Sequence, residues 1–202
     1  MEGGSLYING EKVEPKNPKH MRDLGIAHVP EDRLSTGLSA EATITENMMM
    51  GLQYNEEYAK KKIHLDKEKI RNRTKKLIED FDVRTPSQDV HLGNLSGGNM
   101  QKVVIAREFA FNTPILIISQ PTRGVDIGAI EFIHSQIIEK RNEGCAILLV
   151  SAELDEIFRL SDRIITVYEG EITGEFKNGE ITKSEIGLYM TGKHKSNVGR
   201  GV

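Results

Sequence analysis

The chain has little of what characterises secreted, membrane-spanning or nucleic-acid-binding proteins. Its 202 residues include one cysteine, which excludes an internal disulfide and makes the cytoplasm the natural compartment. No apolar run approaches the length of a membrane span, and residues 1–20 lack the apolar core of a signal peptide. With 27 basic and 30 acidic residues, the formal net charge of −3 gives no electrostatic basis for binding nucleic acid. Any association with a membrane is therefore expected to come through a partner.

Standard motifs for metal and phosphate binding are also missing. The six histidines show no spacing or carboxylate neighbours that suggest a metal site. A phosphate-binding loop reads Gly-x-x-x-x-Gly-Lys-Ser/Thr between a strand and a helix, because it wraps the phosphates and its last hydroxyl binds Mg²⁺. The nearest match, Gly187–His194, ends in histidine and follows a capping box at Thr182 and Glu185 that predicts a helix. We interpret this match as a coincidence.

The apolar pattern predicts an α/β protein. Residues 5–30 contain two short strand candidates, Ser5–Ile8 and Ile26–Val29, separated by a loop in which Pro15 and Pro18 are expected to break structure. Towards the C-terminus the predicted elements are helix 98–111, strand 115–119, helix 127–141, strand 146–151, helix 153–160, strand 163–168, a hairpin strand near 171–176 and a terminal helix at 183–190. Such alternation with continuous apolar strands predicts a parallel sheet covered by helices on both faces.

From Gly37 to about Asn94 the pattern is helical. Thr43 and Glu46 form a capping box that opens onto three consecutive methionines. A second helix carries one face made by Ile70, Thr74, Leu77, Ile78 and Phe81. With 38% hydrophobic residues, the chain is long enough for one domain with an inserted helical lobe.

The most informative stretch, from Leu95 to Lys102, reads Leu-Ser-Gly-Gly-Asn-Met-Gln-Lys and precedes an apolar helix. A serine and two glycines ahead of a helix leave N–H groups free, direct the positive end of the helix dipole outward and add a hydroxyl donor. This combination suits a polyphosphate. By itself Ser-Gly-Gly is typical of an ordinary helix cap. The second stretch that follows, Ile115–Asp126, favours the phosphate-binding interpretation.

These stretches resemble motifs of the ATP-binding cassette family, the nucleotide-hydrolysing subunits of membrane transporters. Leu95–Lys102 is similar to the family's signature motif, Ile115–Gln120 to its Walker B strand, and Gly124–Asp126 to the loop that follows. Leu24–Arg33 resembles the region where the family usually carries a coupling glutamine. Its Pro-Glu-Asp-Arg ending, with asparagine in the signature and Thr-Arg-Gly-Val-Asp after the Walker B strand, most resembles the second cassette of double-cassette importers for simple sugars and nucleosides.

The resemblance covers nearly the whole chain and implies a P-loop NTPase-like parallel sheet with helices on both faces and an inserted helical lobe. It assigns residues 1–37 to part of the core sheet and the glutamine-loop-like region, and residues 38–95 to the helical lobe. Residues 96–202 then form the core with the signature, the Walker B strand and the C-terminal elements. Because Ser5–Gly10 resembles the strand and turn that the family places after its phosphate loop, we expect a cassette cut off at its front, without the Walker A strand and helix.

The chain departs from the family pattern at positions that matter for catalysis. Where the Walker B strand usually ends in an aspartate for the Mg²⁺ shell and a glutamate for the attacking water, this chain has Ser119 and Gln120. Gln120 can hydrogen-bond a water but cannot accept its proton. Two ordinary polar residues at a strand end are the competing interpretation. Ala152 replaces the histidine that contacts the terminal phosphate, and Glu31 replaces the coupling glutamine. These departures imply a nucleotide site of its own that does not hydrolyse ATP, with no intact catalytic residue.

The signature, in contrast, is intact. Cassettes of this family pair head to tail, so the signature of one closes over ATP held by the other. The residues that the resemblance assigns to nucleotide binding are Ser96, Gly97, Gly98, Asn99, Gln101, Asp126 and Glu31. For Asp126 a plain helix cap is the competing role, and both roles can hold together.

The resemblance implies an ATP-binding subunit of an importer for simple sugars or nucleosides. Its cofactor is ATP with Mg²⁺ in the full assembly, and no nucleotide is expected to bind tightly to this chain alone. The expected partners are the first cassette of the same polypeptide, the membrane permease subunits and, indirectly, a periplasmic or lipoprotein solute-binding protein. The expected location is the cytoplasmic face of the plasma membrane, through the permease. The alternative is a non-catalytic regulatory domain that only docks on the permease.

Overall fold

A parallel sheet organises the first of two compact units in the computed structural model, which describes residues 4–60 and 64–194. The first unit ends at Val150. Its sheet has the order β3 (Ile26–Val29), β6 (Ile115–Ser119), β7 (Ala146–Val150), and both strand pairs are parallel. The central strand is the most deeply buried, because it has a neighbouring strand on each side. The predicted α/β fold with a parallel sheet is confirmed.

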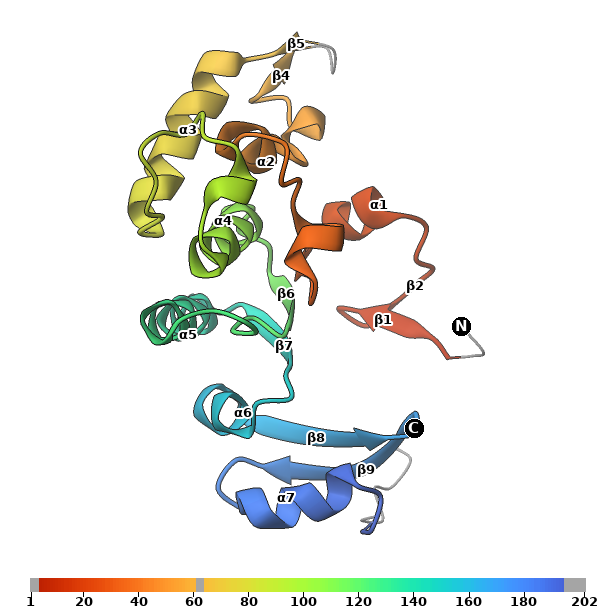
Figure 1. Ribbon diagram of the computed structural model, residues 1–202. Coiled ribbons are helices and arrows are strands. Elements are labelled where there is room, and N and C mark those ends of the chain that lie inside the picture. Colours follow the sequence, from red (N-terminus) through yellow and green to blue (C-terminus); the bar gives the residue numbers. More distant parts are fainter. Residues whose placement is uncertain (1–3, 61–63, 195–202) are drawn as a thin grey trace. The chain divides into compact units, whose positions relative to one another are not determined.

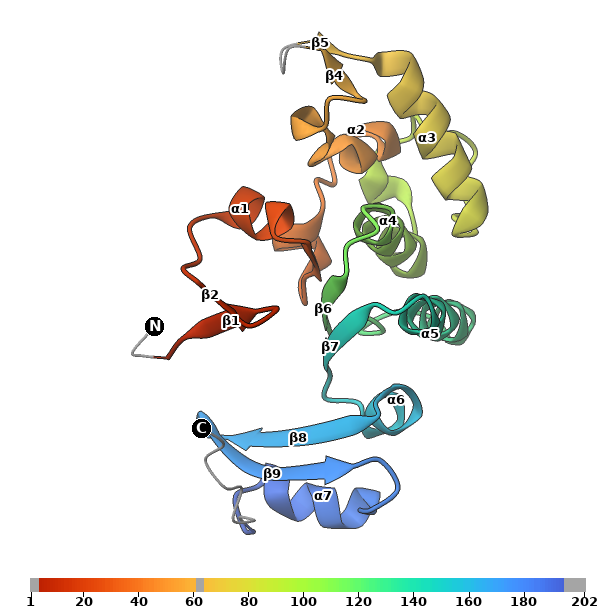
Figure 2. The ribbon, with the colours of Figure 1, turned by 180° about the vertical axis from the view of Figure 1, so that it is seen from behind.

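Helices lie on both sides of this sheet (Figures 1 and 2). Helices α4 (Gly97–Phe109) and α5 (Ile127–Asn142) lie on one side of β6 and β7, and α1 (Pro18–Asp23) lies on the other. The buried face of α5 contains Ile133 and Ile137, which lie four positions apart and therefore on the same side of the helix. The first unit therefore has helices on both sides of a short parallel sheet, although Leu148 and Val150 of β7 are exposed.

Helix α1 corrects the expectation that Pro18 breaks structure. Pro18 is the first helical residue, where its missing N–H would have no partner inside the helix in any case. Asn17 caps the helix, since its side-chain oxygen accepts a hydrogen bond from the His20 N–H at 2.9 Å. An asparagine directly before a proline is a helix-start signal, so the prediction of a loop is wrong at this position.

The first predicted strand is β1 (Leu6–Ile8), and it pairs antiparallel with β2 (Glu11–Val13), a strand that the pattern does not predict.

Between β3 and α4 the chain is largely helical, as predicted. It forms the π-helical turn η1 (Arg33–Gly37), α2 (Ile44–Met49), the 3₁₀ turn η2 (Leu52–Tyr54), the short hairpin β4 (Ala59–Lys60) with β5 (His64–Leu65), α3 (Lys67–Asp80) and the 3₁₀ turn η3 (Leu92–Asn94). The capping box of α2 is confirmed: the Glu46 N–H donates to Thr43 Oγ1 at 3.2 Å, and the Thr43 N–H donates to Glu46 Oε2 at 2.7 Å. The predicted face of α3 is buried at Ile70, Thr74 and Leu77.

Helix α4 lies at the centre of the first unit and contacts α2, α3, α5, β3 and η1. All its residues from Gln101 to Phe109 are buried, including charged ones. Glu108, whose side chain is 2% exposed, accepts hydrogen bonds from Arg107 Nε at 2.8 Å and from Arg22 Nη2 at 3.0 Å. Because a buried charge is tolerated only when it is paired, these contacts explain how a glutamate fits into the core.

The second unit begins at Ser151 and contains α6 (Leu154–Leu160), β8 (Arg163–Tyr168), β9 (Glu171–Lys177) and α7 (Lys183–Met190). Strands β8 and β9 form an antiparallel hairpin, and Ile164, Ile181 and Ile186 form the buried core of the unit. The capping box at Thr182 begins α7 as predicted. Residues 187–190, the first half of the nearest match to a phosphate loop, belong to this helix, so the match does not form a loop between a strand and a helix.

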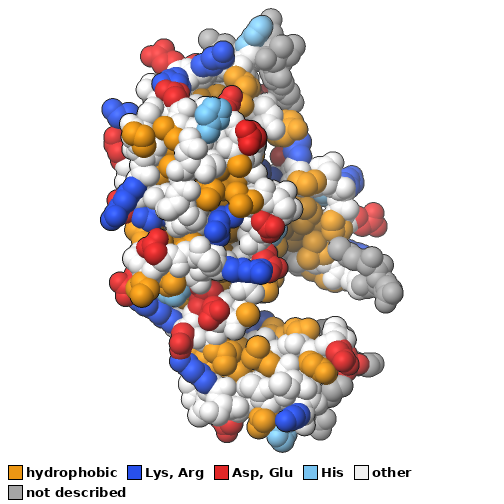
Figure 3. Space-filling model, in the orientation of Figure 1, with side chains coloured by type: hydrophobic (Ala, Val, Ile, Leu, Met, Phe, Trp, Pro, Cys, Tyr) orange, Lys and Arg blue, Asp and Glu red, His pale blue; other side chains and the backbone are white. Residues whose placement is uncertain are grey.

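The surface of the first unit mixes charges of both signs. Figure 3 shows basic and acidic side chains interspersed over its helices, in keeping with the net charge of −3. Within the part of the chain that the structure describes, the helices are all too short or too polar to cross a membrane.

Candidate functional site

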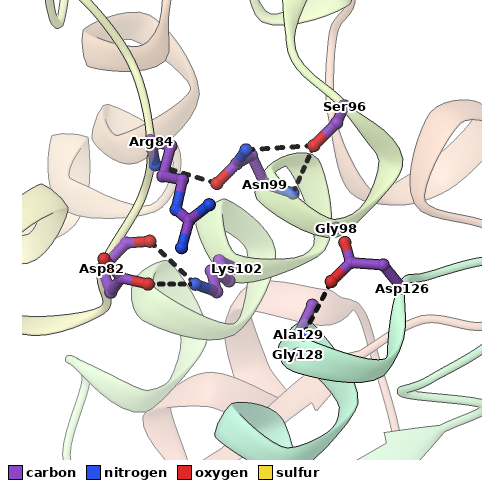
Figure 4. Close-up of a pocket in the computed structure, with 9 residues that line it drawn as sticks. All are labelled: Asp82, Arg84, Ser96, Gly98, Asn99, Lys102, Asp126, Gly128 and Ala129. Atoms are coloured by element: carbon purple, nitrogen blue, oxygen red, sulfur yellow. Dashed lines mark hydrogen bonds and ion pairs between the residues drawn. The ribbon is translucent and has the colours of Figure 1, made fainter.

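A pocket of about 250 Å³ opens beside the N-terminus of α4 (Figure 4). The residues that line it come from three places in the chain: the residues just after α3, the first turns of α4 and the start of α5. The residues that line it are Asp82, Arg84, Ser96, Gly98, Asn99, Lys102, Asp126, Gly128 and Ala129. The structure thus brings together four of the predicted site residues, which lie up to 30 positions apart in the sequence.

Ser96 is the N-cap of α4, as the sequence predicts. Its hydroxyl oxygen accepts hydrogen bonds from the Asn99 N–H at 3.4 Å and from Asn99 Nδ2 at 3.0 Å. Because both contacts use the oxygen as an acceptor, the O–H of this exposed residue can still donate to another group. The first hydrogen bond within α4 joins the Met100 N–H to the Ser96 carbonyl oxygen at 2.9 Å, so the N–H groups of Gly97 and Gly98 precede it and can serve an outside acceptor.

Asn99 connects this turn to the segment that follows α3. Its Oδ1 accepts a hydrogen bond from the Arg84 N–H at 2.8 Å, while its Nδ2 holds Ser96. Figure 4 shows the Arg84 guanidinium extending into the space between Asn99 and Lys102. Asn99 therefore holds the backbone of Arg84 at the pocket and contacts the Ser96 hydroxyl.

Both glycines of the turn are closely packed, so a side chain at either position would displace neighbouring atoms. A Cβ on Gly98 would lie 2.6 Å from Asp126 Oδ2 and 3.1 Å from the Ala129 Cβ. A Cβ on Gly97 would lie 2.9 Å from Arg33 Nη2 and 3.0 Å from the Gly124 carbonyl oxygen. The sequence Gly-Gly thus has a steric cause in the fold, because the loop after β6 lies directly against the start of α4.

Asp126 belongs to that loop and begins α5. Its Oδ1 accepts a hydrogen bond from the Ala129 N–H at 3.0 Å, which confirms the predicted helix cap. Its Oδ2 faces Gly98, and the residue is exposed at the pocket. The capping role and a position at the pocket therefore hold together in the structure.

The pocket also contains a buried lysine. Lys102 Nζ donates to Asp82 Oδ2 at 2.7 Å and to the Asp82 carbonyl oxygen at 2.8 Å, and it lies 4.6 Å from the centroid of the Phe132 ring. The hydrogen bond from Lys102 is the main reason why the pKa of the Asp82 carboxyl is lowered. Sequence reasoning did not identify Asp82, Arg84 or Lys102 as site residues. Lys102 is the one of these three that the sequence could have indicated, because it ends the stretch that contains Ser-Gly-Gly.

Glu31 lies in the turn after β3 and forms an ion pair with Arg123 at 2.5 Å. The next residue, Asp32, caps η1 by accepting hydrogen bonds from the N–H groups of Leu34 at 2.9 Å and Ser35 at 3.1 Å. The backbone N–H of Ser35 is the largest cause of the lowered pKa of Asp32. The Glu31 carboxylate, at the position where the family usually carries its glutamine, thus contacts the loop after β6.

The remaining predicted residues lie elsewhere. Ser119 ends β6, and Gln120 follows it with a left-handed backbone (φ 49°), its N–H donating to the Val150 carbonyl oxygen at 2.8 Å. Gln101 is buried in α4 and is 2% exposed, and it is not among the residues that line the pocket. Ala152 belongs to the second unit, just beyond the end of β7. Among the described residues, no cluster of His, Cys, Asp and Glu could hold a metal ion.

Comparisons with known proteins agree on one family. The family model described as "ABC transporter" matches residues 1–123. The guanosine import ATP-binding protein NupO of Bacillus subtilis is 40% identical over 98% of this chain and 39% of its own length. The nucleoside import ATP-binding protein NupA of Lactococcus lactis is 42% identical over 95% of the chain and 38% of its own length. The glucose import ATP-binding protein TsgD13 of Haloferax volcanii is 39% identical over 95% of the chain and 35% of its own length. The chain therefore spans less than two fifths of the length of these curated relatives.

Solved structures show the same fold. A nucleotide-free ATP-binding cassette from an ABC transporter superposes with a TM-score of 0.74 at 23% identity, covering 92% of this chain and 74% of that one. A dimeric ATP-binding cassette bound to ADP and Pi superposes with a TM-score of 0.72 at 23% identity, covering 89% of this chain and 75% of that one. The chain therefore belongs to the ABC transporter family and has the P-loop NTPase fold of its ATP-binding cassette.

Proposed function

We propose that this chain is part of the ATP-binding subunit of an importer for nucleosides or simple sugars, and that its Ser96 pocket closes over ATP held by a partner cassette. In this proposal residues 38–95 serve as the helical lobe between two core segments, 1–37 and 96–202. The names of the relatives support the solute class, since they import guanosine, nucleosides and glucose. The remaining support comes from the pocket.

The observation that carries the proposal is the arrangement of donors at the start of α4. The Ser96 hydroxyl and the N–H groups of Gly97 and Gly98 precede the first intrahelical hydrogen bond, and the positive end of a helix 13 residues long lies behind them. Arg84 adds a cation beside them. These groups fit the terminal phosphates of ATP, with Asn99 orienting Ser96 and Asp126 bordering the pocket.

The same proposal gives this chain's own nucleotide site no hydrolytic role. Ser119 and Gln120 are uncharged where a metal-shell carboxylate and a base are needed, and Ala152 has no donor for a phosphate. Glu31 is paired with Arg123, so its carboxylate serves a contact within the protein. ATP with Mg²⁺ is then the cofactor of the full assembly and acts at the composite site. The partners are a first cassette of the same polypeptide, permease subunits at the cytoplasmic face of the membrane and, indirectly, a solute-binding protein.

The test is ATP turnover by the full-length protein reconstituted with its permease. Ser96→Arg places a long cation where the phosphate would lie and should abolish turnover. Ser96→Ala removes the hydroxyl alone and should lower kcat/KM by about tenfold or more, the effect of losing one hydrogen bond to a charged group. Ser135→Arg, an exposed serine on α5, is the matched control and should turn over ATP like the wild type. Unchanged turnover in Ser96→Arg would replace the proposal with the docking-domain alternative.

A further inference from the structure

The turn that follows β3 is bound to a loop 90 residues further along the chain. Arg33 Nη1 donates to the Arg123 carbonyl oxygen at 2.8 Å, and Arg33 Nη2 donates to the Gly124 carbonyl oxygen at 3.4 Å. Because one planar guanidinium reaches two successive carbonyl oxygens, the contact fixes the orientation of the loop as well as its distance. The ion pair between Glu31 and the Arg123 side chain lies beside it.

Arg33 also contacts the turn that begins α4. Its Nη2 would lie 2.9 Å from a Cβ on Gly97 and 3.6 Å from a Cβ on Gly124. Gly124 has a φ of +66°, a conformation that favours glycine. The guanidinium therefore occupies the point where three segments meet: the turn after β3, the loop after β6 and the start of α4.

This junction leads directly to the pocket. Two residues beyond Gly124, Asp126 caps α5 and presents its Oδ2 to Gly98. Arg33 does not line the pocket. Arg33 can therefore affect the distance between Asp126 and the Ser96 turn only through its contacts with the loop and with Gly97.

The hydrogen bonds of Arg33 are expected to hold the loop more strongly than the ion pair between Glu31 and Arg123. Glu31 and Arg123 have side chains that are more than half exposed, and exposed ion pairs contribute little. Arg33 is half-buried, and its Nε is buried without a hydrogen-bond partner among the described residues. An unsatisfied buried donor destabilises the fold. A side chain kept in such a place is better explained by what it positions than by its own contribution to stability.

We propose that Arg33 is a positioning residue that holds the loop 122–126 against the start of α4 and so keeps the Ser96 pocket preformed. Its effect on ATP turnover rests on the proposed function, whereas its effect on the loop does not. Arg33 acts through backbone oxygens and never contacts the nucleotide. Lysine at this position could reach one of the two carbonyl oxygens, so it should retain part of the effect.

The experiment combines hydrogen exchange with ATP kinetics on the full-length protein reconstituted with its permease. In Arg33→Ala we expect amide exchange at residues 123–129 to rise about tenfold and kcat/KM for ATP to fall about tenfold, the effect of losing hydrogen bonds from a charged donor. Arg33→Lys should lie between Arg33→Ala and the wild type in both measurements. Arg71→Ala is the matched control, since Arg71 makes two hydrogen bonds to Asp89 on the surface of α3 and should change neither.

Each outcome decides the proposal. A rise in exchange confined to the loop, with a parallel loss of turnover, supports it. Unchanged exchange at residues 123–129 overturns it, and so does a rise spread evenly over the chain, which would mean general destabilisation. If Arg33→Ala raises amide exchange only in the loop but turns over ATP normally, and Ser96→Arg is inactive, then Arg33 holds the loop without affecting the pocket, and that part of the proposal is overturned. If Ser96→Arg is fully active, the proposed function fails instead, and the exchange data still decide whether Arg33 holds the loop.

Discussion

Gly98 offers the sharpest test of how the pocket is built. A methyl group at this position would lie 2.6 Å from Asp126 Oδ2, closer than such atoms approach in proteins, and 3.1 Å from the Ala129 Cβ. Asp126 cannot rotate away without disturbing the hydrogen bond by which its Oδ1 caps α5 at 3.0 Å. Gly98→Ala should therefore force apart the start of α4 and the start of α5.

The magnitude follows from three effects. Losing the cap of α5 costs about 1 kcal/mol, and forcing a methyl group against Ala129 costs about 1–3 kcal/mol. Replacing glycine by alanine in a helix gains at most about 1 kcal/mol, and less in the first turn. The net loss of unfolding free energy is therefore about 1–4 kcal/mol, which corresponds to a Tm lower by about 2–16 °C for a domain of this size.

A neighbouring glycine serves as the control. Gly128 occupies the first turn of α5 and also lines the pocket, but a methyl group there would lie 3.4 Å from Asp126 Oδ1, an ordinary contact. Gly128→Ala should be neutral or stabilise the protein by up to about 1 kcal/mol. The assay is thermal unfolding of the wild type and both variants under one set of conditions. Equal Tm values for Gly98→Ala and Gly128→Ala would refute the steric account of the glycine pair.

Two further predictions concern charged groups. Glu108→Gln leaves Arg107 and Arg22 without their buried counter-charge and should lower the unfolding free energy by about 3–5 kcal/mol in chemical denaturation, whereas the exposed Glu131→Gln should be neutral. Because the folded-state pKa of Asp82 is lowered by Lys102, its contribution to stability is present above the ordinary aspartate pKa and is lost as the pH falls through the lower, folded value. Asp82→Asn should therefore make the unfolding free energy depend less on pH below about pH 4. An unchanged pH dependence in this range would contradict the assignment.

Local signals in the sequence predict the elements well. The strands 115–119 and 163–168 and the helix 183–190 have the predicted bounds. Ser96, Thr43, Thr182 and Asp126 all cap helices as expected, because a cap involves residues only three positions apart. The loop expected at Pro18 is wrong because a breaker was assumed where proline begins a helix.

The contacts that assemble the site are not local, and the sequence pattern does not predict them. Nothing in the Ser-Gly-Gly stretch shows that Gly97 lies against Arg33 or that Gly98 lies against Asp126. Likewise, the sequence pattern does not show that Glu31 pairs with Arg123, 92 positions away. Such contacts join segments far apart in the chain, and they become visible only when the helices and strands are packed together.

The central claim is that ATP bound by a partner cassette covers Ser96, and the accessibility of this residue tests it directly. Cys145 is the one cysteine of this chain, so Ser96→Cys can be labelled selectively once Cys145 and any cysteines in the rest of the full-length protein are replaced by serine. The measurement is the rate at which a thiol reagent modifies this cysteine in the reconstituted transporter, with and without ATP and Mg²⁺, beside Ser135→Cys as the exposed control. The account predicts that ATP slows modification at position 96 by about tenfold or more and leaves position 135 unchanged. Equal rates at position 96 with and without ATP, in protein that still hydrolyses it, would contradict the account.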